Sequence, residues 1–142
     1  LFLFTKAILN GEPIKVFNHG KMKRDFTYID DIIESIIRLI KKPPTPDKSF
    51  DTSNPRADIS WAPHKIFNIG NSKPESLTDY ISAIEDSLGI VAKKIFLPMQ
   101  PGDVPSTYSD CSNLESYINY KPNTPIRDGV DKFVNWYKNF YK

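Results

Sequence analysis

The 142-residue sequence has a single cysteine, Cys111, so it cannot form an internal disulfide bond. No zinc-type spacing of cysteine and histidine accompanies it, and a reducing, cytoplasmic location is expected. Uninterrupted apolar runs are short, so the sequence predicts no membrane-spanning helix, and no signal peptide is recognisable. The sequence also has no large excess of charge of one sign, since it contains 19 Lys and Arg residues and 17 Asp and Glu residues. This balance argues against nucleic acid or a membrane as partner.

Glycine and histidine are also sparse. The six glycines stand at positions 11, 20, 70, 89, 102 and 129, and none of their spacings matches a dinucleotide-binding fingerprint or a P-loop. The two histidines, His19 and His64, are far apart in loop contexts and are interpreted as ordinary surface residues. The residues themselves therefore predict no metal site and no phosphate-binding loop.

The segment Tyr117-Ile-Asn-Tyr-Lys121 has the Tyr-x-x-x-Lys spacing of the catalytic pair of dehydrogenases and reductases. That chemistry needs both side chains one turn apart on a helix, so that the ammonium lowers the pKa of the phenol. Pro122 disfavours helical backbone angles at Lys121, and the motif is interpreted as a helix end with packed tyrosines. No catalytic residue is assigned to this chain.

Twelve prolines divide the chain into short elements. Hydrophobic periodicity and capping residues predict helices over residues 1–10, 30–42, 76–88 and 112–117 and from 124 onward. Strands are predicted over residues 14–17, 24–29, 65–69 and 94–97. Short strands between helices indicate an α/β fold with α+β-like layers in one small lobe.

Two of these segments carry specific predictions about burial. The helix over residues 30–42 has one apolar face, which is expected to be buried and consists of Ile32, Ile33, Ile36, Ile37 and Ile40. Residues 43–63 form a long loop rich in Pro, Ser, Asp and Thr. Its aromatic residues Phe50 and Trp61 indicate that this loop docks on the rest of the chain.

The beginning of the sequence lacks an initiator Met and has the pattern of a helix already under way, which ends at Gly11. We therefore expect a processed or truncated polypeptide, with further motifs upstream of Leu1.

Two segments are candidates for chemistry. Residues 21–24 concentrate positive charge, and Arg24 can form a two-pronged hydrogen bond to phosphate oxygens, although a solvated hairpin tip has the same composition. Residues 100–105 form a rigid loop that carries Gln100 and Asp103. Asp103 can accept hydrogen bonds from sugar hydroxyls or, alternatively, cap a turn.

Four sequence blocks, in order, resemble the extended short-chain dehydrogenase/reductase family of nucleotide-sugar epimerases. The likeness is greatest to bacterial UDP-glucuronate 4-epimerases. The blocks are Ile14–Asn18 with Gly20, Arg24–Ile29 with Asp31, Phe67–Gly70, and Pro101–Val104 with Asp110.

The resemblance implies that residues 1–142 are the carboxyl-terminal, UDP-sugar-binding portion of a longer Rossmann-type enzyme. The NAD-binding domain and the catalytic Tyr and Lys would lie upstream, so the piece alone is expected to be inactive. The implied reaction of the parent is oxidation and re-reduction at C4 with NAD, converting UDP-glucuronate to UDP-galacturonate. The parent is expected to be a homodimer.

The same resemblance implies a set of substrate contacts. The backbone of Lys15, Val16 and Phe17 would face the uracil ring, and Arg24 would hold the diphosphate. Gln100 and Asp103 would face phosphate and ribose, and Thr107 would approach the sugar. Many UDP-galactose epimerases have Arg where Gln100 stands, which favours the glucuronate branch.

Other functions stay open. A related nucleotide-sugar dehydratase or decarboxylase fits the same residues, as does a non-catalytic nucleotide-sugar-binding module or a subunit of a split enzyme. A nucleic-acid-binding domain using Lys21–Arg24 is disfavoured by the near-neutral charge.

Overall fold

The computed structural model describes residues 1–141, which divide into two compact units. Unit 1 comprises Leu1–Phe26, Lys73–Tyr108 and the segment from Thr124 onward, and unit 2 comprises Thr27–Ser72 and Ser109–Asn123. Helices and short strands alternate along the chain, so the predicted α/β class is confirmed. None of the helices in the described part of the chain is long and apolar enough to cross a membrane.

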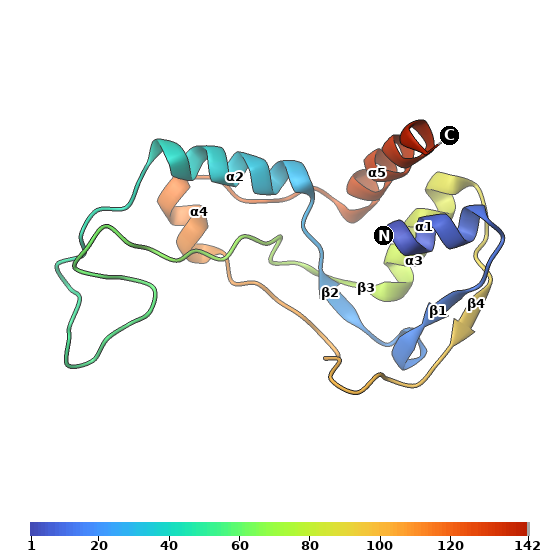
Figure 1. The fold of residues 1–142 in the computed structure, drawn as a ribbon, viewed down its shortest axis with the longest axis horizontal. Coiled ribbons are helices and arrows are strands. Elements are labelled where there is room, and N and C mark those ends of the chain that lie inside the picture. The colour runs from blue at the N-terminus through green and yellow to red at the C-terminus, as the bar shows by residue number, and fades with distance from the viewer. Residues whose placement is uncertain (142) are drawn as a thin grey trace. The chain divides into compact units, whose positions relative to one another are not determined.

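The core of unit 1 is built from three helices, α1 (Phe2–Leu9), α3 (Leu77–Leu88) and α5 (Ile126–Phe140), which lie near one another in Figure 1. Ile81 and Ile84 of α3 and Val134 of α5 are almost completely buried, at 1%, 0% and 0% exposure. The apolar residues of α3 and α5 therefore recur on the buried face of each helix. Tyr141 follows the end of α5 and is 51% exposed.

Helix α3 begins and ends at the residues that the sequence predicts. The Ser76 hydroxyl accepts a hydrogen bond of 3.0 Å from the backbone N–H of Asp79. Gly89 follows the helix with a φ of 69°, the left-handed conformation typical of a glycine at a helix end.

Unit 1 also contains two small sheets. Strand β1 (Ile14–Val16) pairs in parallel with β4 (Lys94–Phe96), and β2 (Lys23–Asp25) pairs antiparallel with β3 (Pro74–Ser76). A short 3-10 segment, η1 (Phe17–Gly20), follows β1. The predicted strand over residues 24–29 is too long, because pairing stops at Asp25 and Ile29 already begins a helix.

Unit 2 contains α2 (Ile29–Lys41) and α4 (Ser112–Ile118). The prediction of a buried isoleucine face on α2 is wrong: Ile33, Ile36, Ile37 and Ile40 are 47%, 45%, 41% and 73% exposed. The buried side of the helix carries Asp31 and Ser35 instead. Its polar groups are satisfied within unit 2, since Tyr120 Oη donates to Asp31 Oδ1 at 2.7 Å and Ser35 Oγ donates to the Asp31 carbonyl at 2.7 Å.

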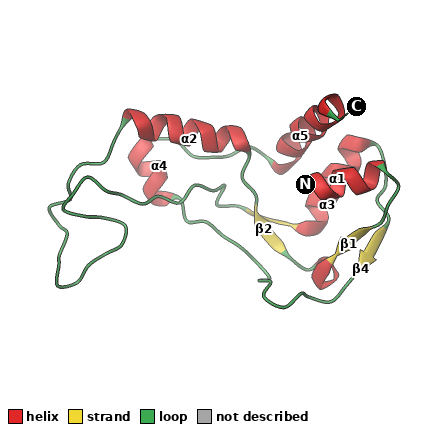
Figure 2. Cartoon of the chain, viewed as in Figure 1, coloured by secondary structure: helices red, strands yellow, loops and turns green. Residues whose placement is uncertain are grey.

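The chain between α2 and β3 has no helix or strand (Figure 2). The predicted strand over residues 65–69 is therefore wrong as a paired strand, because only Lys65 forms a β-bridge, with Ile59. Trp61 is 71% exposed, which contradicts its predicted docking, whereas Phe50 is half-buried.

Candidate functional site

The basic residues 21–24 follow a tight turn of unit 1. Asn18 and His19 have φ values of 47° and 50°, and Gly20 has a φ of 78°. A Cβ on Gly20 would meet Thr78 Cγ2 at 3.3 Å, so the turn lies directly against the start of α3. The His19 N–H donates to the Leu97 carbonyl at 3.0 Å. The side chain of Met22, two residues after the turn, is buried. This leaves the side chains of Lys21 and Lys23 exposed to solvent.

Arg24 lies in the middle of β2, opposite Glu75 of β3. Glu75 is already paired, since its carboxylate lies 2.9 Å from Lys73 Nζ. Arg24 Nη1 donates to the Lys23 carbonyl at 2.9 Å. A guanidinium has five N–H donors, so this contact leaves Arg24 with capacity to bind an anion.

The other edge of β2 is occupied by residues 105–107. Lys23 N–H donates to the Pro105 carbonyl at 2.9 Å, and Thr107 N–H donates to the Lys23 carbonyl at 3.3 Å. The Thr107 hydroxyl oxygen accepts a bond of 3.0 Å from the Asp25 N–H. The structure therefore brings Arg24 and Thr107 to neighbouring positions, although Thr107 Oγ1 already has a structural partner.

Gln100 and Asp103 occupy the two ends of one turn, in the loop that leads from β4 to residues 105–107. The Asp103 N–H donates to the Gln100 carbonyl at 3.2 Å, and Gly102 has a φ of 87°. Proline followed by a glycine of positive φ is typical of a type II turn. Gln100 is exposed and Asp103 is half-buried, so both side chains remain accessible.

The backbone of β1 has one occupied edge. Ile14 N–H donates to the Lys93 carbonyl at 2.8 Å, and the Val16 carbonyl accepts from Leu97 N–H at 2.9 Å. Because successive residues of a strand direct their backbone groups to opposite edges, the N–H and carbonyl of Lys15 point away from β4. Val16 itself is 0% exposed and Phe17 is half-buried. Of these three residues, Lys15 has the backbone groups that are best placed for a ligand.

Arg24 also lines a hollow of about 350 Å³ whose other walls are apolar. This hollow was not predicted from the sequence. The sequence did contain a signal for part of this lining. Arg24 and Phe26 are two residues apart on an extended segment, so their side chains lie on the same face. Phe26 and Tyr80 stack with ring centroids 4.3 Å apart. The remaining lining residues are Leu1, Phe2, Leu3, Phe4 and Leu77.

The electrostatic character of this hollow comes from Arg24. Burial raises the pKa of Tyr80 well above its usual value, so its phenol stays neutral. A cation set beside stacked aromatic rings suits a ligand that combines an anionic group with an apolar or aromatic body.

The structure supports the rejection of the Tyr117–Lys121 motif. Helix α4 ends at Ile118, and Asn119 adopts a φ of 50°. Lys121 lies beyond this end, and its Nζ is 3.7 Å from a Glu115 carboxylate oxygen. The Tyr117 hydroxyl donates to the Pro43 carbonyl at 3.2 Å.

Comparison with known proteins finds similar sequences and structures. Residues 1–70 match the sequence model of the NAD dependent epimerase/dehydratase family. Protein CapI of Staphylococcus aureus is 51% identical over 142 residues, which are 100% of this chain and 42% of CapI. The family resemblance predicted from the sequence is thereby confirmed. A probable UDP-glucuronate 4-epimerase of Rhizobium meliloti is 40% identical over 148 residues, 100% of this chain and 42% of that protein.

Among solved structures of this epimerase family, the UDP-glucuronic acid 4-epimerase from Bacillus cereus in complex with UDP-glucuronic acid and NAD is similar in fold. It is 28% identical, with a TM-score of 0.74, and the match covers 97% of this chain and 39% of that chain. The chain therefore spans about two fifths of the length of these relatives, in their carboxyl-terminal part.

Proposed function

We propose that this chain binds the nucleoside diphosphate of a UDP-sugar, as the carboxyl-terminal, substrate-binding portion of an NAD-dependent UDP-glucuronate 4-epimerase. The observation that carries the proposal is the position of Arg24. Arg24 lies on strand β2 directly after Lys23, three residues after Lys21, and both lysines are exposed. Its side chain lines the hollow beside Phe26 and Tyr80. A relative of 40% identity that is named a probable UDP-glucuronate 4-epimerase supports the substrate class.

In this proposal the parent enzyme interconverts UDP-glucuronate and UDP-galacturonate by inversion at C4. NAD does not fit the residues present here, because none of the glycines has the spacing of a dinucleotide-binding loop. NAD binding and the reacting centre are therefore assigned to the upstream part of the parent, and this chain alone is expected to be inactive.

The residues of this chain would hold the end of the substrate that does not react. Arg24 would bind the diphosphate, and the outward backbone groups of Lys15 would match the imide edge of the uracil. Gln100 and Asp103 would contact phosphate and ribose from their shared turn. Binding energy from this remote end can orient the sugar for the chemistry supplied elsewhere.

Two alternatives predict different products. A nucleotide-sugar dehydratase or decarboxylase would release water or carbon dioxide from the same bound substrate, whereas an epimerase returns an isomer of equal mass. Mass spectrometry of the products of an intact parent enzyme distinguishes them. A non-catalytic binding module would bind UDP and form no product with any partner.

We also propose that the parent enzyme lies in the cytoplasm. The described part of the chain holds one cysteine, Cys111, as a buried free thiol, which supports a reducing cytoplasm. The proposed assembly of the parent enzyme is a homodimer.

Titration calorimetry with UDP tests the proposal. We expect Arg24→Ala to lower UDP affinity about 10- to 100-fold, because a hydrogen bond to a charged group contributes about 1.5–3 kcal/mol. Arg24→Lys should recover part of the lost affinity, because lysine keeps the positive charge but cannot form the two parallel hydrogen bonds of a guanidinium. Arg127→Ala is the matched control, because this exposed arginine of unit 1 forms an ion pair with Asp86 instead. Equal UDP affinity in Arg24→Ala and the unmodified chain would contradict the assigned site.

A further inference from the structure

Unit 2 contains a hollow of its own, of about 170 Å³, which we call the Lys65 hollow. One side of it is formed by the loop over residues 43–63, in which the Asp47 N–H donates to the Ser60 carbonyl at 2.9 Å. The buried Ile59 forms an antiparallel bridge with Lys65. Tyr117 of α4 lies on another side. All lining residues belong to unit 2, so the hollow is complete within one compact unit.

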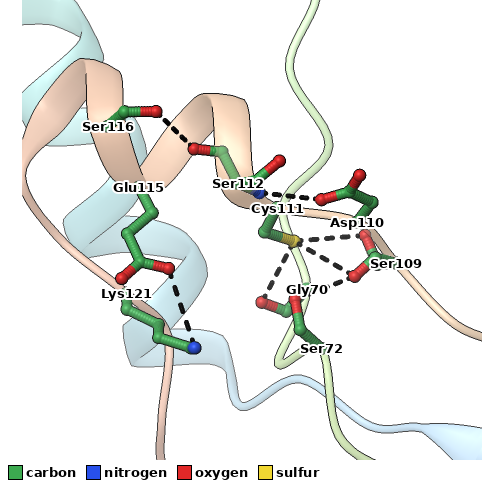
Figure 3. A network of polar contacts seen from close by, with 9 residues as sticks. All are labelled: Gly70, Ser72, Ser109, Asp110, Cys111, Ser112, Glu115, Ser116 and Lys121. Carbon is green, nitrogen blue, oxygen red and sulfur yellow. Dashed lines mark hydrogen bonds and ion pairs between the residues drawn. The ribbon is translucent and has the colours of Figure 1, made fainter.

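Hydrogen bonds fix the position of Tyr117 beside the Lys65 hollow, because they attach the start of α4 to the chain around Gly70 (Figure 3). Cys111 Sγ donates to the Gly70 carbonyl at 3.4 Å, and Ser72 Oγ donates to the Ser109 carbonyl at 2.8 Å. The two segments that line the hollow are therefore connected directly.

The ammonium group of Lys65 has no counter-ion. The residue is half-buried, and within residues 1–141 it forms no ion pair. Its Nζ lies 5.2 Å from the ring centre of Tyr117 and 5.7 Å from that of Phe67, and the two ring centres are 4.8 Å apart. An ammonium that is taken out of water is unfavourable unless it is paired, and contacts with ring faces replace only part of its hydration. Lys65 therefore has capacity to bind an anion.

Two further lysines add positive charge around the same ring. Lys42 Nζ lies 4.5 Å from the ring centre of Tyr117 and donates to the Tyr117 carbonyl at 2.6 Å. Lys48 lines the hollow, is exposed, and forms no ion pair in the part of the chain that the structure describes. An anion in the hollow would therefore meet more than one ammonium group.

One carboxylate, that of Asp47, also lines the hollow. Its Oδ1 accepts hydrogen bonds of 2.9 Å and 2.6 Å from the N–H and the hydroxyl of Ser49. These bonds, with a smaller contribution from Lys65, lower the pKa of Asp47, so this group is ionised at neutral pH. Asp58 of the same loop is paired with Arg56 at 2.6 Å. The lining thus carries two ammonium groups and one carboxylate, and its net charge is positive.

We propose that the Lys65 hollow binds a phosphate group, held by the ammonium groups of Lys65 and Lys48 with the Thr45 hydroxyl as a further donor. Lysine binds phosphate as a point charge, and a phosphate dianion offsets both ammonium groups. A volume of about 170 Å³ is below the roughly 300–1,000 Å³ of sites for larger ligands, so a whole UDP-sugar does not fit. The ligand is free phosphate or a small phosphomonoester. This inference does not rest on the proposed function, whose site lies in unit 1.

Nuclear magnetic resonance tests the site on the 142-residue chain. Inorganic phosphate is titrated while the backbone amide shifts of Lys65 and Tyr117 are followed, with sodium chloride of equal ionic strength as the reference. We expect the shifts to saturate with phosphate and not with chloride, because screening alone produces no saturation. Shifts that rise without saturation in both salts would overturn the site. Acetate binding as tightly as phosphate would overturn the phosphate assignment.

Matched variants change the affinity in opposite directions. Lys65→Met should weaken phosphate binding at least about tenfold, because a hydrogen bond to a charged group is lost while the apolar stem is kept. Lys48→Met should also weaken binding, and at this exposed position it does not disturb packing. Asp47→Asn should strengthen binding about two- to fivefold, since it removes the opposing charge. Lys41→Met, at an exposed lysine of α2 outside the hollow, is the control and should bind normally.

The direction of these changes decides the outcome. A purely structural role of Lys65 and Asp47 would not strengthen binding in Asp47→Asn. Phosphate affinity that is unchanged in both Lys65→Met and Lys48→Met overturns the site. A comparison of inorganic phosphate with glycerol 3-phosphate identifies the tighter ligand, and saturable binding of either one through Lys65 supports the proposal.

The same titrations separate this inference from the proposed function. Phosphate binding that is lost in Lys65→Met, in a chain that does not bind UDP, supports the Lys65 hollow and contradicts the substrate site at Arg24. Phosphate binding that is lost in Arg24→Ala and kept in Lys65→Met assigns the phosphate to the substrate site and overturns the present proposal. UDP binding should be unchanged in Lys65→Met.

Discussion

The backbone N–H of Asp25 donates a hydrogen bond of 3.0 Å to Oγ1 of Thr107, a residue 82 positions further along the chain. This hydrogen bond connects the end of β2 to the segment that follows the Gln100–Asp103 turn. Together with the two backbone hydrogen bonds of Lys23 to Pro105 and Thr107, this contact connects the sequence blocks that carry Arg24 and Asp103.

Replacement of Thr107 by valine should reduce both stability and UDP affinity. Thr107→Val leaves the Asp25 N–H without its acceptor in a half-buried position, and the expected loss is about 1–2 kcal/mol in the free energy of unfolding. Because Arg24 precedes Asp25 on the same strand, UDP affinity should fall as well, by less than in Arg24→Ala. Urea unfolding and calorimetry measure the two effects. Thr107→Ser keeps the acceptor and should remain near the unmodified chain in both; a valine variant with unchanged stability would show that the bond contributes nothing.

Gly20 and Gly89 offer a matched pair for the turn beside the basic residues. Both have positive φ, so alanine is strained at either position by about 1–2 kcal/mol. Only at Gly20 would the new Cβ also meet a neighbour, Thr78 Cγ2 at 3.3 Å, whereas nothing lies within 4 Å at Gly89. Gly20→Ala should therefore destabilise the chain more than Gly89→Ala in urea unfolding. Gly20→Ala alone should also lower UDP affinity, since the turn precedes Lys21–Arg24, and equal effects of both variants would argue against the close approach.

Ile84 is the central core position of α3, at 0% exposure. Ile84→Ala should lower the free energy of unfolding by about 2–5 kcal/mol, through lost burial and the cavity left behind. Val91→Ala, at a position that is 83% exposed, is expected to change it by no more than about 0.5 kcal/mol. Thermal unfolding followed by circular dichroism compares the two. A small effect of Ile84→Ala would mean that the α3 and α5 contact is not the core of unit 1.

The free energy of unfolding should decrease at alkaline pH because of Tyr120. Desolvation, and next the hydrogen bond to Asp31, raise its pKa to about 12 from the ordinary value of 10.0. The pKa is higher in the folded state, so the stabilisation is fully present below pH 10 and is lost as the pH rises toward 12. Urea unfolding at pH 8 and pH 11 measures this loss, which should be smaller in Tyr120→Phe; the remainder comes from Tyr80, whose pKa burial also raises. Tyr108→Phe, at a tyrosine that is 65% exposed, is the control and should keep the pH dependence of the unmodified chain.

The sequence by itself determined the elements whose signals are local. Ser76 and Gly89 mark the two ends of α3 because a cap and a left-handed glycine depend only on nearby backbone groups. The Gln100–Asp103 turn follows equally from the proline and glycine between them. For the same reason the basic cluster around Arg24 could be recognised as a candidate anion site.

Only the tertiary structure decided the features that require contact between two parts of a protein, such as the burial of a helix face and the pairing of a strand. The isoleucines of α2 have the periodicity of a buried face, and residues 65–69 have the composition of a strand, yet the described chain supplies neither a covering surface nor a pairing edge. The hollow beside Arg24 likewise arises only when Phe26 meets Tyr80 of α3. Periodicity states that a surface is suited to burial, but burial and strand pairing are properties of two surfaces, and only the folded chain shows whether the second one is present.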